Sequence, residues 1–143
     1  YPGPSPGQVM RLFLDANILF TAAHNASGKA ALVIELGQAG LWQVVSSAYA
    51  FEEARRNIAR KYPDRLVRLE AFRSILRLVA DTGRSGCPPG LPDKDCPIYR
   101  AACLAKADVL LTGDIRDFGF LMNDRTQADG LLIQTVADFL DGL

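Results

Sequence analysis

The chain has 143 residues, of which 49% are hydrophobic and 22% are charged, so it is long enough for one domain with a single core and is not disordered by composition. No apolar run approaches the roughly 20 residues that span a bilayer. No charged segment followed by a long apolar run marks a signal peptide. We therefore expect a cytoplasmic protein without a membrane partner. Residues 1–9 have no periodic pattern, and we expect a flexible tail or cloning remnant there, followed by one domain at 10–143.

The cysteine and histidine content argues against two kinds of cross-link. The three cysteines, Cys87, Cys96 and Cys103, are odd in number, and we expect free thiols in a reducing compartment. A zinc site usually includes histidine as well as cysteine. Because His24 is the single histidine of the chain, we expect no zinc site.

Apolar segments alternate with amphipathic segments along the chain. One example is the stripe Phe51, Ala54, Ile58 and Tyr62, whose spacing predicts a helix that Ser47 begins and Pro63 ends. Strands are predicted at 10–14, 42–46, 75–80, 108–112 and 131–134, and helices at 16–23, 28–38, 47–62, 64–74, 95–106, 118–122 and 135–140. Near-continuous apolar strands that alternate with helices predict an α/β fold, a single-domain α/β/α sandwich with a mostly parallel five-stranded sheet.

Acidic residues follow the predicted strands. Asp15 follows the first strand, Glu52 and Glu53 the second, Asp95 the third and its long loop, and Asp114 the fourth. The carboxyl ends of parallel strands lie at one edge of the sheet, where ligands bind in such folds. Carboxylates gathered there repel one another, and a hard divalent cation such as Mg²⁺ or Mn²⁺ removes that cost.

A second interpretation of these acids is structural. Aspartate at a strand-to-helix junction is a common helix N-cap, so any one of them alone is explained as a cap. Four converging acids, with Lys94 and Arg116 as the only basic neighbours in the adjacent sequence, favour a metal site. The helical positions of Glu52 and Glu53 leave open which of the two belongs to it.

The net charge is zero, but the charges are unevenly distributed. Between Arg55 and Arg77 there are eight basic and two acidic residues, a net charge of +6 that leaves −6 on the rest of the chain. A basic flank beside an acidic pocket suits a metal-dependent nuclease. The alternative is a pair of solvated amphipathic helices. The basic residues are Arg55, Arg56, Arg60, Lys61, Arg65, Arg68, Arg73 and Arg77.

Four motifs, taken together, resemble the PIN domain. They are Leu14-Asp15-Ala16-Asn17, Glu53-Ala54-Arg55-Arg56-Asn57, Asp93-Lys94-Asp95 with Ala101-Ala102 downstream, and Leu111-Thr112-Gly113-Asp114. Their order and spacing match that family, and the resemblance covers about residues 10–140. The Thr-Gly-Asp motif after an apolar strand is the most specific of the four.

The resemblance implies a Mg²⁺- or Mn²⁺-dependent ribonuclease and a set of site residues. It implies a preference for Glu53 over Glu52, because the family places an acid before an arginine-containing helix. Catalytic acids are expected at Asp15, Glu53, Asp95 and Asp114, of which Asp15, Asp95 and Asp114 are expected to bind the metal, with secondary polar residues at Asn17, Asp93, Thr112 and Asp117 and RNA-binding residues at Arg55, Arg56 and Arg60.

We therefore expect an endoribonuclease that hydrolyses RNA phosphodiester bonds. Many bacterial members of the family are VapC-type toxins, so an antitoxin protein is a candidate partner beside the RNA substrate, and a homodimer is a candidate assembly. The main alternative is a catalytically inactive PIN-like module that binds RNA or protein. A phosphatase or receiver-like domain is less favoured, because the arrangement of lysine and threonine around a nucleophilic aspartate is not recognisable in the sequence.

Overall fold

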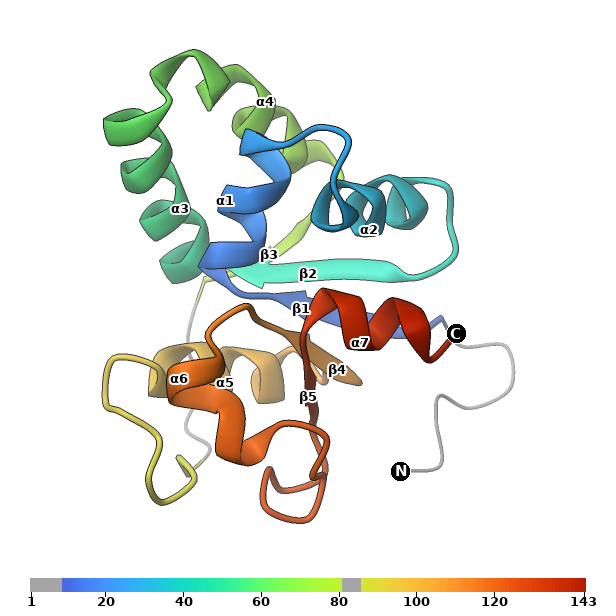
Figure 1. Cartoon of the computed structure of the whole chain (residues 1–143), viewed down its shortest axis with the longest axis vertical. Helices are drawn as coiled ribbons and strands as arrows, with labels where there is room; N and C mark the ends of the chain where they lie inside the picture. The colour runs from blue at the N-terminus through green and yellow to red at the C-terminus, as the bar shows by residue number, and fades with distance from the viewer. Residues whose placement is uncertain (1–8, 81–85) are drawn as a thin grey trace.

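One parallel sheet organises the chain. The computed structural model describes residues 9–80 and 86–143, so the predicted tail lies, apart from Val9, outside the described residues. The strands are β1 (Arg11–Leu14), β2 (Gln43–Ser47), β3 (Arg77–Val79), β4 (Val109–Leu111) and β5 (Leu132–Gln134). They pair in the order β3-β2-β1-β4-β5 (Figure 1), and each pair is parallel. This confirms the predicted α/β fold with a five-stranded sheet.

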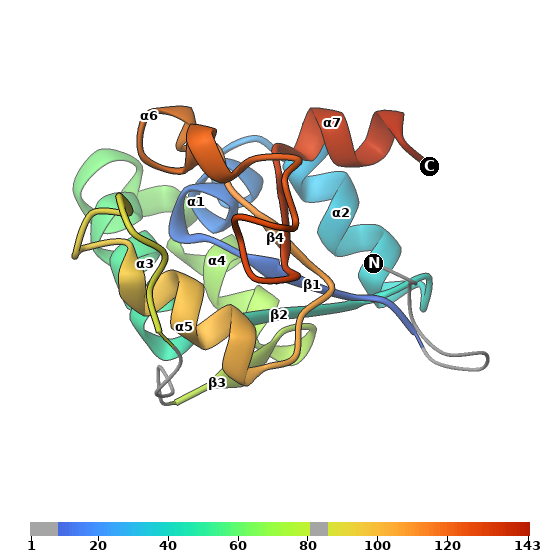
Figure 2. The same cartoon turned by 90° about the horizontal axis from the view of Figure 1, so that it is seen from below.

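Helices cover both faces of this sheet. They are α1 (Ala16–His24), α2 (Lys29–Gln38), α3 (Ala48–Lys61), α4 (Leu66–Ala71), α5 (Cys96–Leu104), α6 (Ile115–Phe118) and α7 (Val136–Asp141). Helices α1 to α4 lie on one side of the strands, and α5 and α6 lie on the other (Figures 1 and 2). Helix α7 returns to α2, and Phe139 packs edge-on against Trp42 with ring centroids 5.2 Å apart.

The strand order has a topological switch next to β1. The chain continues from β1 to β2 and β3 on one side, and then crosses to β4 and β5 on the other. Leu12 of β1 is in register with Val44 of β2 and with Val109 of β4. Parallel sheets bind ligands at the carboxyl edge beside such a switch. In this chain that position lies between the ends of β1 and β4.

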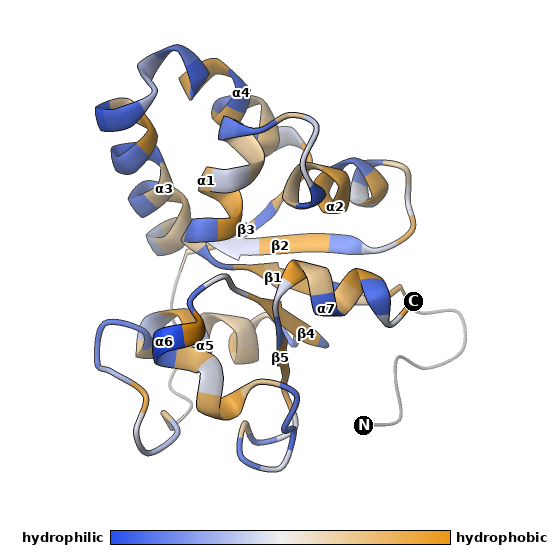
Figure 3. Ribbon diagram, viewed as in Figure 1, coloured by the Kyte–Doolittle hydropathy of each residue, from blue (hydrophilic) through white to orange (hydrophobic). Residues whose placement is uncertain are grey.

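Helix α3 forms as its sequence predicts, with one exception. Ser47 caps it, since its hydroxyl accepts a hydrogen bond of 3.0 Å from the backbone N–H of Ala50. Phe51, Ala54 and Ile58 are buried, and hydrophilic residues lie along the outer side of the helix (Figure 3). Tyr62, predicted as part of the apolar stripe, is instead the C-cap residue and is 36% exposed, because the chain leaves the helix there ahead of a proline.

Two predicted helices have different boundaries. The helix expected at 64–74 is divided into a 3-10 turn at Pro63–Arg65, helix α4, and a second 3-10 turn at Phe72–Ser74. The helix expected at 118–122 begins earlier as α6, because Asp114 caps it at Ile115, and it continues as the 3-10 turn Gly119–Leu121. Strand β3 is shorter than predicted because only three residues pair with β2.

The expectation of three free thiols was wrong. Cys87 and Cys96 form a disulfide, with Cα atoms 5.7 Å apart, and Cys103 is not disulfide-bonded. The loop turns back on itself, since the N–H of Leu91 donates to the carbonyl of Pro88 at 3.2 Å. This turn brings Cys87 to the start of α5, and no periodicity in an irregular loop predicts such an approach.

Among the described residues, no helix is both long and apolar enough to cross a membrane.

Candidate metal and active site

The predicted acids meet in a small pocket at the carboxyl edge of the sheet. Its cavity volume is about 90 Å³. The pocket is lined by Asp15, Asn17, Tyr49, Glu53, Lys94, Asp95, Ile98 and Asp114. A larger groove of about 720 Å³ lies at the opposite edge of the sheet, next to Arg11, Lys106 and Asp108. That groove brings no comparable group of acids together, so the smaller pocket is the candidate site.

Asp15 lies at the end of β1 and is held in one orientation. It is 4% exposed, and its Oδ1 accepts a hydrogen bond of 2.6 Å from the N–H of Ala16. Its Oδ2 accepts from the hydroxyl of Thr112 at 2.8 Å and from Nδ2 of Asn17 at 3.2 Å. Burial raises the pKa of Asp15 to about 6, and the negative charge of Glu53 adds to that rise.

Asn17 and Thr112 join the ends of β1 and β4. Oδ1 of Asn17 accepts from the N–H of Gly113 at 2.7 Å, and the hydroxyl of Thr112 accepts from the N–H of Asp114 at 3.1 Å. Since the same hydroxyl donates to Asp15, Thr112 links the backbone of one candidate acid to the side chain of another. Both residues were predicted as secondary polar residues, and the structure places them beside the acids.

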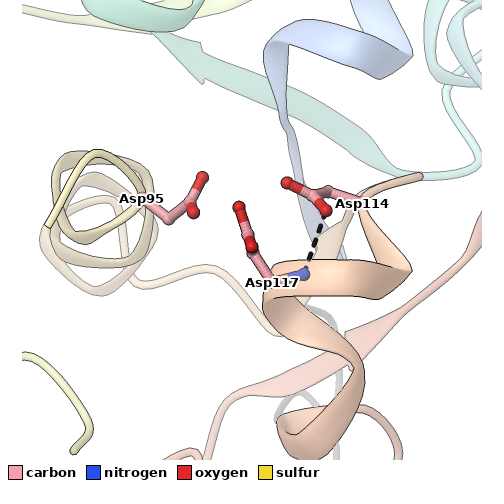
Figure 4. Close-up of side chains that lie close together, drawn as sticks. All are labelled: Asp95, Asp114 and Asp117. Atoms are coloured by element: carbon pink, nitrogen blue, oxygen red, sulfur yellow. Dashed lines mark hydrogen bonds between the residues drawn. The ribbon is translucent and has the colours of Figure 1, made fainter. Parts of the chain in front are cut away.

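Three carboxylates form a second group on the other side of the pocket. Each of Asp95, Asp114 and Asp117 offers one oxygen, and these oxygens lie within 4.8 Å of one another. The side chains converge from the start of α5 and from α6 (Figure 4). Oδ1 of Asp114 accepts a hydrogen bond of 3.0 Å from the N–H of Asp117.

Of the three aspartates, Asp95 is the one whose charged form is most disfavoured by its surroundings. It is 7% exposed, and its Oδ2 is buried without a hydrogen-bond partner among the described residues. Burial raises the pKa of Asp95 to about 7, and the nearby charges of Asp117 and Asp114 contribute to the rise. In contrast, the hydrogen bond from Lys94 lowers the pKa of Asp117. A buried carboxylate oxygen that accepts no hydrogen bond, beside two further carboxylates, fits a hard divalent cation, which takes oxygen ligands.

The structure distinguishes Glu53 from Glu52, which the sequence could not. Glu53 is half-buried and lines the pocket. Glu52 does not line the pocket, and its Oε1 accepts from Arg55 at 2.6 Å. That hydrogen bond lowers the pKa of Glu52. The geometry therefore places Glu53 with the other acids, in the position that the family resemblance gave it.

The cap interpretation accounts for part of this arrangement. Asp15 accepts from the first amide of α1, and Asp114 caps α6. Asp95 occupies the N-cap position of α5, but its side chain accepts no capping hydrogen bond. Glu53 lies inside α3 and is no cap. Capping therefore explains Asp15 and Asp114 but gives no reason for Asp95 and Glu53 to face them.

The remaining predicted residues are spread more widely. Asp93 is exposed and does not line the pocket. On α3, Arg55 is paired with Glu52, Arg60 donates to Oδ1 of Asn57 at 3.2 Å, and Arg56 is exposed. Three pocket residues were given no role from the sequence, namely Lys94, Tyr49 and the apolar Ile98. The Asp93-Lys94-Asp95 motif was a signal for Lys94, whereas the sequence has none for Tyr49.

Comparisons with known proteins match the chain to one family and to several solved structures. A family model of the PIN domain matches residues 11–116. No curated protein sequence is significantly similar to the chain.

Several solved structures share the fold. One is VapBC2 from Rickettsia felis bound to a DNA fragment from their promoter, with a TM-score of 0.62 and 16% identity over 88% of this chain and 98% of that one. DNA-bound VapBC from Salmonella typhimurium has a TM-score of 0.60 and 16% identity over 89% of this chain and 98% of that one. VapC20 from Mycobacterium tuberculosis is a toxin that cleaves the sarcin–ricin loop. It has a TM-score of 0.53 and 13% identity over 76% of this chain and 94% of that one.

Proposed function

Because the chain belongs to the PIN domain family, we propose that it is a divalent-metal-dependent endoribonuclease that hydrolyses RNA phosphodiester bonds. The observation that carries the proposal is Asp95, a buried carboxylate that lies with Asp114 and Asp117 and whose Oδ2 accepts no hydrogen bond among the described residues. Burying a carboxylate without hydrogen-bond partners is costly, and the ammonium group of Lys94 is 3.8 Å from this oxygen. An oxygen-binding cation at this point would offset that cost.

The acids divide into two groups with different roles. We assign Asp95, Asp114 and Asp117 to holding the metal, since their oxygens already converge. Mg²⁺ or Mn²⁺ bound there would lower the pKa of a water ligand and stabilise charge on the phosphoryl oxygens. Asp15 and Glu53 line the same pocket, where they can orient the attacking water or complete the coordination. Asn17 and Thr112 keep Asp15 in place through its Oδ2.

The structural neighbours suggest a biological setting for this activity. Two of them are VapBC complexes bound to DNA, and a third is a toxin that cleaves the sarcin–ricin loop. We propose by analogy that this chain is the toxin of a toxin–antitoxin pair, acting on RNA in the cytoplasm and neutralised by an antitoxin protein. The analogy rests on similarity of fold at 13–16% identity. An inactive module that binds RNA or protein is the second candidate, favoured by the caps that Asp15 and Asp114 form.

A cleavage assay with controlled metal content tests the proposal. Purified protein freed of metal is incubated with an end-labelled single-stranded RNA in Mg²⁺, in Mn²⁺ and in EDTA. We expect internal cleavage in either metal and none in EDTA. Asp95→Asn serves as the matched negative protein, because it removes the negative charge of the buried carboxylate with almost no change in shape. Cleavage that persists in EDTA, or in Asp95→Asn at the rate of the parent, would contradict the metal mechanism.

A further inference from the structure

Lys94 is a basic residue at the mouth of an acidic pocket. It directly precedes Asp95, and its Nζ lies 2.8 Å from Oδ2 of Asp117 and 3.8 Å from Oδ2 of Asp95. Among the described residues that line the pocket it is the sole basic one. Its side chain is 69% exposed, whereas the side chains of Asp95 and Asp117 are 11% and 13% exposed. The ammonium group therefore lies between the acids and the solvent from which a substrate arrives.

The backbone of Lys94 is fixed although its side chain is exposed. The hydroxyl of Tyr49 donates to its carbonyl at 3.4 Å, and the next N–H, of Asp95, donates to the carbonyl of Pro92 at 2.9 Å. Cys96 follows immediately and is bonded to Cys87. The loop thus holds the base of the side chain in place, and the four-carbon stem is left to move the ammonium group.

The negative charge around the pocket explains why a basic residue such as Lys94 would help to bind RNA. Four carboxyl groups line the pocket, those of Asp15, Glu53, Asp95 and Asp114, and the carboxylate of Asp117 lies next to those of Asp95 and Asp114. A phosphodiester is an anion, and a divalent cation offsets only part of that negative charge. Lys94 is the solvent-exposed partner of its ion pair with Asp117, since its side chain is 69% exposed and that of Asp117 is 13% exposed. The ammonium group can therefore turn from Asp117 to a phosphate oxygen, and a cation bound at the three-acid group would then compensate the charge of Asp117.

We propose that Lys94 contacts the scissile phosphate, donating an N–H to a non-bridging oxygen whose negative charge grows in the transition state. This inference rests on the proposed ribonuclease function and adds a residue to it. Lysine suits the role, because a compact charge on a flexible stem follows a phosphate without needing a planar partner. Asp117 then has two roles, since it offers an oxygen to the cation site and holds the ammonium group until RNA arrives.

If Lys94 were only a counter-ion for the acids, its variants would behave differently from those of a phosphate-binding residue. If the lysine were only a counter-ion that takes the place of a metal, removing it would strengthen the response to Mg²⁺. Cleavage at saturating metal would then be unchanged. If it contacts the phosphate, the response to metal is retained and the chemical step slows.

Three variants separate these roles. Lys94→Gln removes the charge at similar length, Lys94→Arg keeps the charge, and Lys29→Ala removes a lysine from the start of α2, outside the pocket. Single-turnover cleavage of the labelled RNA is measured at saturating Mg²⁺. RNA binding is measured in EDTA over a series of salt concentrations, and thermal unfolding is measured with and without Mg²⁺.

We expect Lys94→Gln to lower the single-turnover rate by about 100-fold, the lower end of the effect of losing one donor to a developing oxyanion. Lys94→Arg should retain most of the rate, and Lys29→Ala all of it. The slope of log affinity against log salt should fall by roughly 0.7 in Lys94→Gln, the change for one phosphate contact with a single strand. The increase in melting temperature with Mg²⁺ should be retained.

An unchanged rate in Lys94→Gln, or an unchanged salt slope, would overturn the phosphate contact. A slower rate together with a lost Mg²⁺ response would also overturn it, since the lysine would then organise the acids and not the substrate. Failure of the proposed function looks different, because the parent protein itself would not cleave RNA. In that case the salt slope of Lys94→Gln still decides whether Lys94 contacts a phosphate.

Discussion

Asp114 has two roles that one substitution separates. Its Oδ1 caps α6 by accepting from the N–H of Asp117 at 3.0 Å, and its carboxylate also belongs to the three-acid group. Asparagine caps a helix about as well as aspartate, so Asp114→Asn should retain the cap and lose the charge. We expect the metal-free variant to be as stable as the parent or more so, because a source of like-charge repulsion is gone. RNA cleavage should collapse.

Thermal unfolding with and without Mg²⁺, beside the cleavage assay, measures both effects. Ligand binding raises the melting temperature by mass action, so Mg²⁺ should stabilise the parent more than the variant. Thr135→Ala is the matched cap control, since Thr135 accepts from the N–H of Asp138 at 3.1 Å far along the chain. It should lose about 1 kcal/mol of stability and keep full cleavage. Retained cleavage by Asp114→Asn with an equal Mg²⁺ response would mean that Asp114 is only a cap.

The raised pKa values of Asp15 and Asp95 predict how metal-free stability depends on pH. The pKa values are about 6 and about 7 in the folded chain, against an ordinary value of 3.8. Between about pH 4 and pH 7, the folded state therefore holds more protons on these two groups than the unfolded state does. The stabilisation is fully present below about pH 4 and is lost as the pH rises through 6 and 7.

In EDTA, these two groups should therefore make the protein more stable at pH 5.5 than at pH 8. Mg²⁺ competes with the protons, so its stabilising effect should be larger at pH 8. Melting temperatures at the two pH values, with and without Mg²⁺, measure both trends. The double variant with Asp15→Asn and Asp95→Asn should lose most of the difference between the pH values in EDTA. A difference of the same size in that variant would assign it to other groups.

The sequence predicted that acids meet at one edge of the sheet, but not that they form two groups there. Parallel strands place Asp15 and Asp114 at one edge whatever the loops do, so these two acids followed from the strand pattern alone. The division into Asp15 with its hydrogen bonds and Asp95 with Asp114 and Asp117 depends on where α6 begins. That start was predicted three residues too late, at 118 rather than Ile115. Asp117 was assigned a secondary role by the family resemblance, although its oxygen lies with those of Asp95 and Asp114.

At the scale of elements, the loop before α5 is the segment that the sequence described least well. It lacks periodicity, so neither its turn at Pro88 nor the bond between Cys87 and Cys96 followed from the pattern. The buried strands β1, β2 and β4 were predicted to within about one residue, because continuous apolar runs have few alternatives. Strand β3 lies at the edge of the sheet with an exposed or half-buried pattern, and such weakly apolar strands have poorly defined ends.

The disulfide predicts that the loop contributes to stability. A cross-link with a sequence separation of 9 restricts the unfolded chain by about 2.5 kcal/mol in the chain-entropy description. Cys87→Ser should therefore lower the melting temperature under non-reducing conditions, and a dithiol reductant should lower that of the parent to a similar value. The Mg²⁺ response should weaken as well, because Cys96 directly follows Asp95.

Cys103→Ser is the control for this prediction, since Cys103 lies on the same helix outside the disulfide. It should behave like the parent in both conditions. Alkylation of the unfolded, unreduced parent should modify one cysteine, and alkylation after reduction should modify three. Modification of all three without reductant would show that the bond is absent in solution.

At the scale of the whole molecule, the chain separates its charges. The segment from Arg55 to Arg77 carries a net charge of +6, and it runs from α3, whose Glu53 lines the acidic pocket, to β3. This separation of charge can be read from the sequence, whereas the strand order cannot, because α/β folds built from the same elements differ in strand order. The basic segment begins in the helix after β2 and ends in β3, and the order β3-β2-β1-β4-β5 makes these two strands neighbours. Strand β2 also pairs with β1, which Asp15 follows. The basic helix α3 and the carboxylates therefore share one edge of the sheet.

This arrangement predicts that α3 guides RNA toward the acids. Arg56 and Arg60 follow Glu53 by three and seven residues, so they lie on the same side of the helix as this pocket residue. Both are exposed, whereas Arg55 is held by Glu52. Replacing Arg56 and Arg60 together by alanine should weaken RNA binding and lower the slope of log affinity against log salt by roughly 1.4, at about 0.7 for each lost phosphate contact.

Binding titrations over a range of salt concentrations, with EDTA present so that the RNA stays intact, measure this slope. Arg55→Ala is the matched control on the same helix, because its guanidinium is already paired and should change the slope little. Cleavage at saturating RNA should remain close to that of the parent in the double variant, since neither arginine lines the pocket. The loss should therefore appear at low RNA concentration. An unchanged slope would mean that these arginines form a solvated helix face, and that RNA reaches the acids by another route.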